Sequence, residues 1–236
     1  VMGKGELKVI PILFKLKKDI VGETFKIGSV NLVRQGTISL IAILLNNTLY
    51  LYGSQTGGIG GEVAISVYGL ATRMAMFALF PLIGIAQGFM PIAGYNYGAN
   101  HFDRVKSVIN VSLIAGLAVS IVITAILLFS SNYVPYLFTK DPALIEHGPT
   151  AIFWIFSSTP ILVFLLIAPS YFQAIGKALP ALLLTLTKQG IFLIPLVFIL
   201  PMFLGLEGIW YSFPISDSIS AIICYYFLRK SSNKLT

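Results

Sequence analysis

A carboxylate lies deep within an apolar stretch of this sequence. Asp217 follows Glu207 by ten residues and precedes Arg229 by twelve, so a helix through this stretch places it near the middle of a membrane. An unpaired carboxylate is costly there as a charge and tends to take up a proton. Such a group suits ion coupling, because a proton, a sodium ion or a cationic drug could each neutralise it. The alternative is a structural contact with Arg73, Lys188, Ser216 or Ser218.

Other polar side chains also interrupt apolar stretches and are candidates for a substrate or ion pathway. They are Gln35, Arg34, Asn46, Arg73, Gln87, Lys188 and Gln189. A polar group in a membrane needs a cavity or a partner, so Arg73, the deepest cation of its stretch, requires a buried partner or a water-filled cleft. Structural explanations stay open for the others. Arg34 can extend to the membrane surface, and Gln87 can bond a neighbouring helix. Lys188 can extend to the membrane surface or line a cavity.

Residues 84–106, GIAQGFMPIAGYNYGANHFDRVK, change abruptly from apolar to polar sequence. Pro91 is expected to bend or end the preceding helix, and the glycines and asparagines after it suit a tight turn. The pattern predicts the inner mouth of a membrane pathway, built from Pro91, Gly94, Tyr95, Asn96, Gly98 and Arg104. A capped loop between two helices, without chemistry, would explain the same residues.

The residue types argue against an enzyme or a metal centre. The sequence contains no His-Glu-x-x-His run, no paired intramembrane aspartates and no Ser/His pair within its apolar stretches. We therefore expect no catalytic residues, no metal site and no cofactor. The lone Cys224 rules out an intrachain disulfide. The net charge of +7 reflects membrane topology better than nucleic-acid binding.

Membrane-spanning helices must position these residues. The chain is 56% hydrophobic and 11% charged, with a mean hydropathy of +0.87, which a soluble domain would carry only with aggregation. About 20 apolar residues span a roughly 30 Å hydrocarbon core as a helix. We predict an all-α, polytopic membrane protein with six transmembrane helices. They lie at about 27–52, 63–93, 107–130, 148–172, 178–204 and 208–228.

Lysines and arginines gather in alternate loops. Six precede the first segment, two lie between the second and third, one lies between the fourth and fifth, and three follow the sixth. The other loops contain only Lys140. Because such cations stay on the cytoplasmic side, both termini are predicted to be cytoplasmic, in a multi-pass protein of the cell membrane.

The predicted organisation has three parts. Residues 1–26 form a cytoplasmic connector ending in an amphipathic helix on the membrane surface, 27–230 form the six-helix lobe, and 231–236 form a cytoplasmic tail. A connector at this position indicates that the chain is the second part of something longer. Within the fourth segment, the run from Ser157 to Pro160 predicts a kink whose freed carbonyls are satisfied by hydroxyl groups.

Several motifs together are similar to the C-terminal lobe of the multidrug and toxic compound extrusion (MATE) family. They are VAISVYGLATR at 63–73, GIAQGFMPIAGYNYGA at 84–99 with Asp103 and Arg104, YFQAIGK at 171–177, Lys188-Gln189-Gly190 with Pro195, and Gly208-Ile209-Trp210 with Asp217. The similarity covers essentially the whole chain. A full family member has two six-helix lobes, and only the second is present in this sequence.

The resemblance implies one lobe of a secondary multidrug exporter. In such a transporter a cavity between the lobes alternates access, and a proton or sodium gradient drives export of cationic or amphipathic drugs. The expected partners are the missing N-terminal six-helix lobe, the lipid bilayer and the drugs, with no nucleic acid. Some branches of the family place acidic cation ligands on the first and fourth helices of this lobe, where this sequence has neither Asp nor Glu.

One alternative is half of a lipid-linked oligosaccharide flippase of the same superfamily. A flippase would need several cations in its central cavity to bind a pyrophosphate group. Arg34, Arg73 and Lys188 are the cations within the predicted spans that could serve this purpose.

Overall fold

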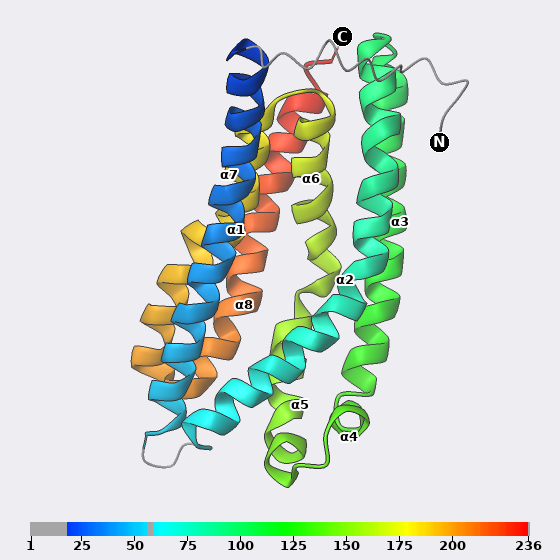
Figure 1. Ribbon diagram of the computed structural model, residues 1–236. Helices are drawn as coiled ribbons and strands as arrows, with labels where there is room; N and C mark the ends of the chain where they lie inside the picture. Colours follow the sequence, from blue (N-terminus) through cyan, green and yellow to red (C-terminus); the bar gives the residue numbers. More distant parts are fainter. Residues whose placement is uncertain (1–17, 56–58, 236) are drawn as a thin grey trace, which may run out of the picture.

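The computed structural model describes residues 18–55 and 59–235, so most of the predicted connector lies outside the described part. The described chain forms a bundle of long helices that run up and down past one another (Figure 1). The elements are α1 (Lys18–Gly53), α2 (Gly61–Gly98), α3 (Phe102–Phe129), α4 (Val134–Phe138), α5 (Pro142–Ser157), η2 (Thr159–Ile161), α6 (Leu162–Ala174), α7 (Ala178–Leu186), η3 (Thr187–Leu193) and α8 (Ile194–Ser232). The prediction of an all-α membrane protein is confirmed.

Five helical stretches of the described chain are long and apolar enough to cross a membrane. They are Gln35–Gly53, Gly61–Gly98, Phe102–Phe129, Pro142–Ala174 and Ala178–Ser232. The last has 55 residues. A straight helix of that length would measure about 80 Å, far more than the roughly 30 Å hydrocarbon core.

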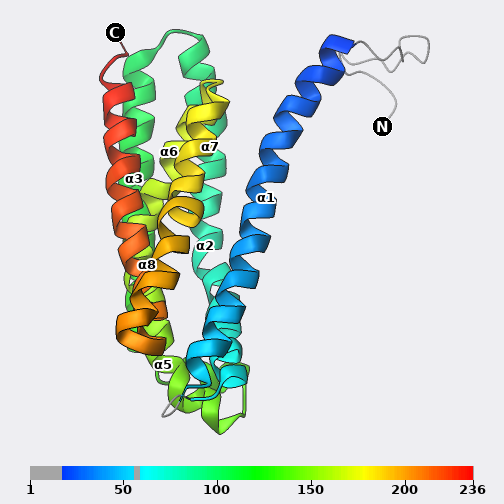
Figure 2. The ribbon, with the colours of Figure 1, turned by 90° about the vertical axis from the view of Figure 1, so that its left-hand side faces the viewer.

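The last stretch therefore reverses its direction within α8. Gly205 has φ 59° and ψ −143°, angles that break the helix and that glycine adopts without a Cβ clash. The two arms then pack closely, because a Cβ on Gly208 would lie 2.6 Å from the carbonyl carbon of Leu200. Figures 1 and 2 both show the stretch Ala178–Ser232 descending through α7 and then returning to the end of the bundle where the described C-terminus lies.

Helix α1 joins the end of the predicted connector to the first predicted transmembrane segment, while the predicted surface helix lies mostly outside the described residues. Residues 18–26 continue directly into the first transmembrane segment as one helix of 36 residues, because no proline interrupts the sequence there. At about 1.5 Å per residue this helix is roughly 54 Å long, so it projects beyond the hydrocarbon core. In Figure 2 its first half diverges from the bundle, while its second half lies against α2.

The predicted inner mouth is mainly helical. Helix α2 continues through Pro91 to Gly98, so of the two expected effects of Pro91, a bend or a helix end, the helix end is excluded. Proline removes one backbone hydrogen bond but keeps a helical φ, and buried Phe89 and Ala93 on either side fix the helix in the core. The turn comes at Asn100, which has φ 58°, a left-handed conformation that asparagine tolerates.

The predicted kink in the fourth segment is confirmed. Helix α5 ends at Ser157, a 3₁₀ turn spans Thr159–Ile161, and α6 continues from there. The Ser157 hydroxyl donates to the carbonyl of Trp154 at 2.7 Å, which satisfies a carbonyl that the break leaves free. The segment from 142 to 174 thus crosses the bundle as two helices with an irregular turn between them.

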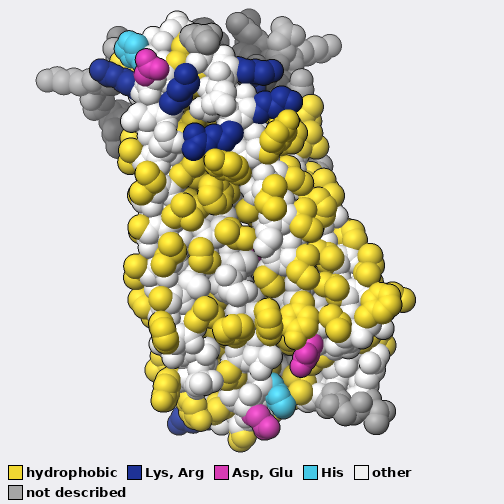
Figure 3. Space-filling view, turned by 180° about the vertical axis from the view of Figure 1, so that it is seen from behind, with side chains coloured by type: hydrophobic (Ala, Val, Ile, Leu, Met, Phe, Trp, Pro, Cys, Tyr) yellow, Lys and Arg dark blue, Asp and Glu magenta, His cyan; other side chains and the backbone are white. Residues whose placement is uncertain are grey.

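The interior is packed with apolar side chains toward both ends of the bundle. Toward the end near Asn100 the buried residues include Phe89, Ile109, Ile167, Tyr171 and Leu228. Toward the opposite end they include Leu45, Leu49, Val67, Ile209 and Trp210. The outside is also apolar, with hydrophobic side chains along the length between the two ends (Figure 3). An exposed apolar surface of this extent is suited to lipid.

Candidate functional site

The predicted deep carboxylate is the centre of a buried polar cluster. Asp217 lies in the returning arm of α8 and is only 3% exposed. Its Oδ1 atom is 2.8 Å from the Lys188 Nζ atom of η3. Its Oδ2 atom accepts a hydrogen bond of 2.7 Å from the Ser158 hydroxyl, at the break between α5 and α6. The cluster therefore joins three separate segments of the chain at one point within the bundle.

An irregular turn brings Lys188 to this point. Residues 187–193 form the π-helix η3 between α7 and α8, and such turns leave the regular backbone bonding pattern. The Ser216 hydroxyl donates to the Lys188 carbonyl at 2.9 Å. Two consecutive residues of α8, Ser216 and Asp217, thus hold the backbone and the side chain of Lys188. Polar side chains satisfy this turn within an otherwise apolar interior.

A cavity of about 370 Å³ opens beside the cluster. Its walls come from five regions of the chain: α1, α2, the α5–α6 break, η3 and the returning arm of α8 with Phe213. Apolar side chains make up most of the lining, and Tyr68, Thr72, Thr159, Lys188 and Asp217 supply its polar groups. An apolar cavity with a few convergent polar groups is the usual form of a small-molecule site.

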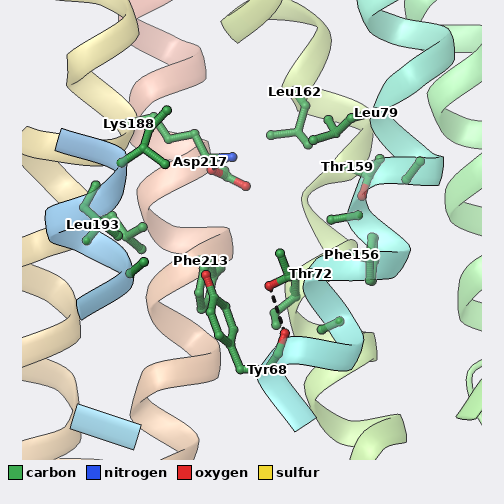
Figure 4. A pocket seen from close by; sticks show the side chains of 17 residues that line it. Tyr68, Thr72, Leu79, Phe156, Thr159, Leu162, Lys188, Leu193, Phe213 and Asp217 are labelled. Atoms are coloured by element: carbon green, nitrogen blue, oxygen red, sulfur yellow. Dashed lines mark hydrogen bonds and ion pairs between the residues drawn. The ribbon is translucent and has the colours of Figure 1, made fainter. Parts of the chain in front are cut away.

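Aromatic side chains form one side of the cavity. The rings of Tyr68 and Phe213 are stacked, with centroids 5.9 Å apart and planes inclined by 27°. Figure 4 shows both rings below Lys188 and Asp217, with Phe156 across the cavity. The Thr72 hydroxyl donates to the Tyr68 carbonyl at 2.9 Å, so it is already used within α2. The cavity thus combines a flat aromatic surface with one ion pair.

The structure brings Asp217 and Lys188 together but leaves other predicted pathway residues outside the cavity. Gln35, Asn46, Arg73 and Gln87 are all exposed on the bundle surface. Arg73 is exposed in this lobe, while its neighbour Thr72 lines the cavity. The expectation of a buried partner or a water-filled cleft for Arg73 stays a prediction. The backbones of Arg34 and Gln189 lie in α1 and η3, and their side chains are outside the described part.

The inner-mouth residues lie at one end of the bundle, away from this cavity. Pro91, Tyr95, Gly98 and Arg104 are exposed, as suits a surface facing water or another part of a larger assembly. Asn96 is buried and its Nδ2 atom donates to the Ile92 carbonyl at 2.8 Å.

Gly94 has a packing role. A Cβ there would lie 3.1 Å from the Ala174 carbonyl oxygen, so α2 and the end of α6 approach closely.

Sequence reasoning missed the aromatic and hydroxyl lining of the cavity. On α2 the lining residues Tyr68, Ala71, Thr72, Ala75, Ala78 and Leu79 recur every three or four positions. That spacing marks a single helix face and was readable from the sequence. Phe213 lies one helical turn before Asp217, which was a second signal. The contribution of Ser158 required the fold, since 59 positions separate it from Asp217.

The fold and the site together define a helical membrane protein with a buried ion pair beside an internal cavity. The family model described as MatE matches residues 38–199, which is more than half of the chain. The chain therefore belongs to the MatE family, in agreement with the motifs of its sequence.

Similar proteins also come from curated sequences and solved structures. The multidrug export protein MepA of Staphylococcus aureus is 28% identical over 221 residues, which cover 92% of this chain and 47% of MepA. An outward-facing structure of a multidrug resistance MATE family transporter has a TM-score of 0.84 at 20% identity, covering 97% of this chain and 50% of that one. An inward-facing structure with the same description has a TM-score of 0.83 at 20% identity, covering 94% and 50%. The chain thus spans about half the length of the relatives it matches.

Proposed function

We propose that this chain is one lobe of an ion-coupled secondary exporter of amphipathic organic compounds, including cations. The observation that carries this proposal is the Lys188–Asp217 ion pair, which lies beside an apolar cavity inside a membrane bundle. Buried charges in membrane proteins are costly and are associated with substrate and ion pathways. Membership of the MatE family and the similarity to MepA support the same function.

The ion pair offers a simple means of coupling. A proton added to Asp217, or a sodium ion beside it, would neutralise the carboxylate and release the Lys188 ammonium. The cavity would then gain positive charge, and its affinity for an amphipathic compound would change. Linked changes in the affinity for two ligands are what coupling requires. The coupling ion in this proposal is therefore a proton or sodium.

A second six-helix lobe completes the proposed transporter, with both termini of this chain on the cytoplasmic side of the cell membrane. Lobes that rock as rigid bodies around a central site would alternate access between the two sides. This lobe has nearly equal TM-scores to an outward-facing and an inward-facing structure. A lobe that moves as a rigid body would keep the same internal fold in both states.

The described cavity lends little support to the alternative of a flippase. Lys188 is the cation among its lining residues, and it is already paired with Asp217. A pyrophosphate group would require several cations that are free to bind it. We also propose that the chain is not an enzyme, since the two charged groups that line the cavity are paired with each other rather than aligned as nucleophile and base.

Efflux of ethidium, a fluorescent organic cation, tests the proposed function. The full two-lobe protein is placed in membrane vesicles, and proton and sodium gradients are imposed in turn. We expect one of the two gradients to drive efflux, and Asp217→Asn to abolish it, because asparagine keeps the shape but cannot exchange charge. Glu146→Gln, which changes an exposed carboxylate, serves as the matched control and is expected to transport normally.

A further variant separates coupling from folding. Asp217→Asn leaves Lys188 unpaired, and breaking a buried pair costs about 3–5 kcal/mol. Combining Asp217→Asn with Lys188→Met removes both charges and restores neutrality. If this folded double variant still transports with the gradient, the pair is structural and the proposal fails. If neither gradient drives efflux by the wild-type protein, the chain is not part of an ion-coupled exporter.

A further inference from the structure

We propose that the cavity beside Lys188 binds an aromatic amphiphile through an anionic or hydrogen-bond-accepting group. Lys188 is the residue that binds this group, and the stacked rings of Tyr68 and Phe213 receive the apolar part. The inference names a ligand class for the cavity of the proposed function, and it rests on that function only in treating the cavity as a binding site. It differs from the expectation that a buried carboxylate marks a site for cations.

The two charges of the pair are unequally accessible from the cavity. The Lys188 side chain is 27% exposed, whereas the Asp217 side chain is 4% exposed. Both residues line the cavity, and Lys188 offers an incoming molecule more accessible side-chain surface than Asp217 does. The local field at the point of contact is positive even though the pair as a whole is neutral, and a nearby charge dominates over a more distant one.

The hydrogen bonds and the ion pair of Asp217 also leave Lys188 as the group that is available to a ligand. Asp217 receives the Ser158 hydroxyl on Oδ2 and faces the Lys188 ammonium with Oδ1. A cation could reach the carboxylate only by displacing an ammonium group that lies 2.8 Å away. An ammonium group has three hydrogens to donate. Among the described residues, Asp217 is the partner of Lys188 Nζ, so hydrogens remain for an incoming acceptor.

The rest of the cavity specifies the apolar part of the ligand. Its volume of about 370 Å³ suits a compound of one or two fused rings. Tyr68 and Phe213 provide a flat surface on which such rings can stack. Phe156 and Leu79 close the opposite wall (Figure 4). An aromatic carboxylate fits these features, since its ring and its charged group match the two ends of the cavity.

A pair of probes with the same ring and opposite charge tests this proposal. Binding of naphthoate and of naphthylmethylammonium to the purified protein in lipid nanodiscs is measured by calorimetry, without any ion gradient. We expect naphthoate to bind more tightly than the matched cation by about tenfold or more. Lys188→Met should remove or reverse this preference, because it uncovers Asp217. Lys177→Met, which removes an exposed lysine at the end of the bundle, should keep it.

The combined variant Lys188→Met, Asp217→Asn guards against misfolding caused by an unpaired carboxylate. It should be as compact as the wild-type protein by size exclusion and should bind both probes without preference. The proposal is overturned if wild-type protein prefers the cation, if naphthoate shows no saturable binding, or if Lys188→Met keeps the wild-type preference. Because no gradient is used, failure of transport and failure of this binding preference are separate results.

Discussion

At the scale of single residues, two neighbours on α8 fix the position of one lysine. Ser216 binds the Lys188 carbonyl and Asp217 pairs with the Lys188 side chain, so backbone and side chain are held from the same turn of helix. Ser158 holds the carboxylate from the other side. A buried charge is tolerated in a low-dielectric interior only when it is paired and hydrogen-bonded. This cluster meets that condition.

Replacing Ser216 should weaken the cluster without removing a charge. In Ser216→Ala the Lys188 carbonyl loses its hydrogen bond within the bundle, and we expect a loss of about 1–3 kcal/mol of stability. The change is measured as a lower midpoint of thermal unfolding in detergent. Ser218→Ala, two positions along the same helix at an exposed site, is the control and should change stability by less than about 0.5 kcal/mol. Equal effects of the two substitutions would contradict the positioning role of Ser216.

At the scale of elements, irregular backbone surrounds the site. The π-helix η3 supplies Lys188, and the break at η2 follows directly after Ser158. Regular helices would continue past these points and turn the two side chains elsewhere, because each residue of an α-helix advances by about 100°. Local irregularities of this kind are common at functional sites. The fold therefore builds the cluster by departing from regular helix at two places.

The reversal at Gly205 is a third irregularity, and it determines which arm of α8 faces the site. Gly205→Ala should destabilise the protein by about 1–3 kcal/mol, because a Cβ is strained at this positive φ. Thermal unfolding in detergent again gives the measurement. Gly69→Ala is the matched control, since a Cβ there meets no atom within 4 Å and alanine favours a helix. Normal stability of Gly205→Ala would show that the turn can form without glycine.

At the scale of the whole molecule, charge separates the two ends of the bundle. The turn at Asn100 and the described C-terminus share one end, and most of the cations visible in Figure 3 gather there. The loop that contains Lys140 lies at the opposite end, beside α4. Since lysine and arginine remain on the cytoplasmic side, this distribution predicts the orientation of the lobe.

Cysteine labelling in intact cells tests that orientation. Cys224 is fully buried, and Cys224→Ala removes the thiol of this chain; any cysteines of the second lobe are replaced in the same background. From this background we expect Asn100→Cys to resist a membrane-impermeant maleimide until the cells are opened, and Lys140→Cys to react at once. Both positions are exposed, so accessibility on the protein itself does not separate them. The reverse pattern would place the termini outside the cell.

The sequence by itself determined the class of the fold and the identity of its central residue. Six apolar segments and the alternation of cations required an all-α membrane protein, because backbone groups must be satisfied within lipid. Asp217 stood out because a carboxylate deep in an apolar stretch is costly without a role. The break after Ser158 was also predictable, since local hydroxyl and proline patterns act within a few residues.

Only the tertiary structure decided which partners Asp217 has. Arg73, Lys188 and two serines were equal candidates by sequence, and the choice of Lys188 with Ser158 depended on how distant segments pack. Packing also determined that α2 continues as a helix past Pro91 and that Arg73 lies on the exposed face of that helix. Contacts between residues far apart in the chain follow from the arrangement of whole helices. Local sequence states which groups need a partner, and the packing of the bundle selects the partner.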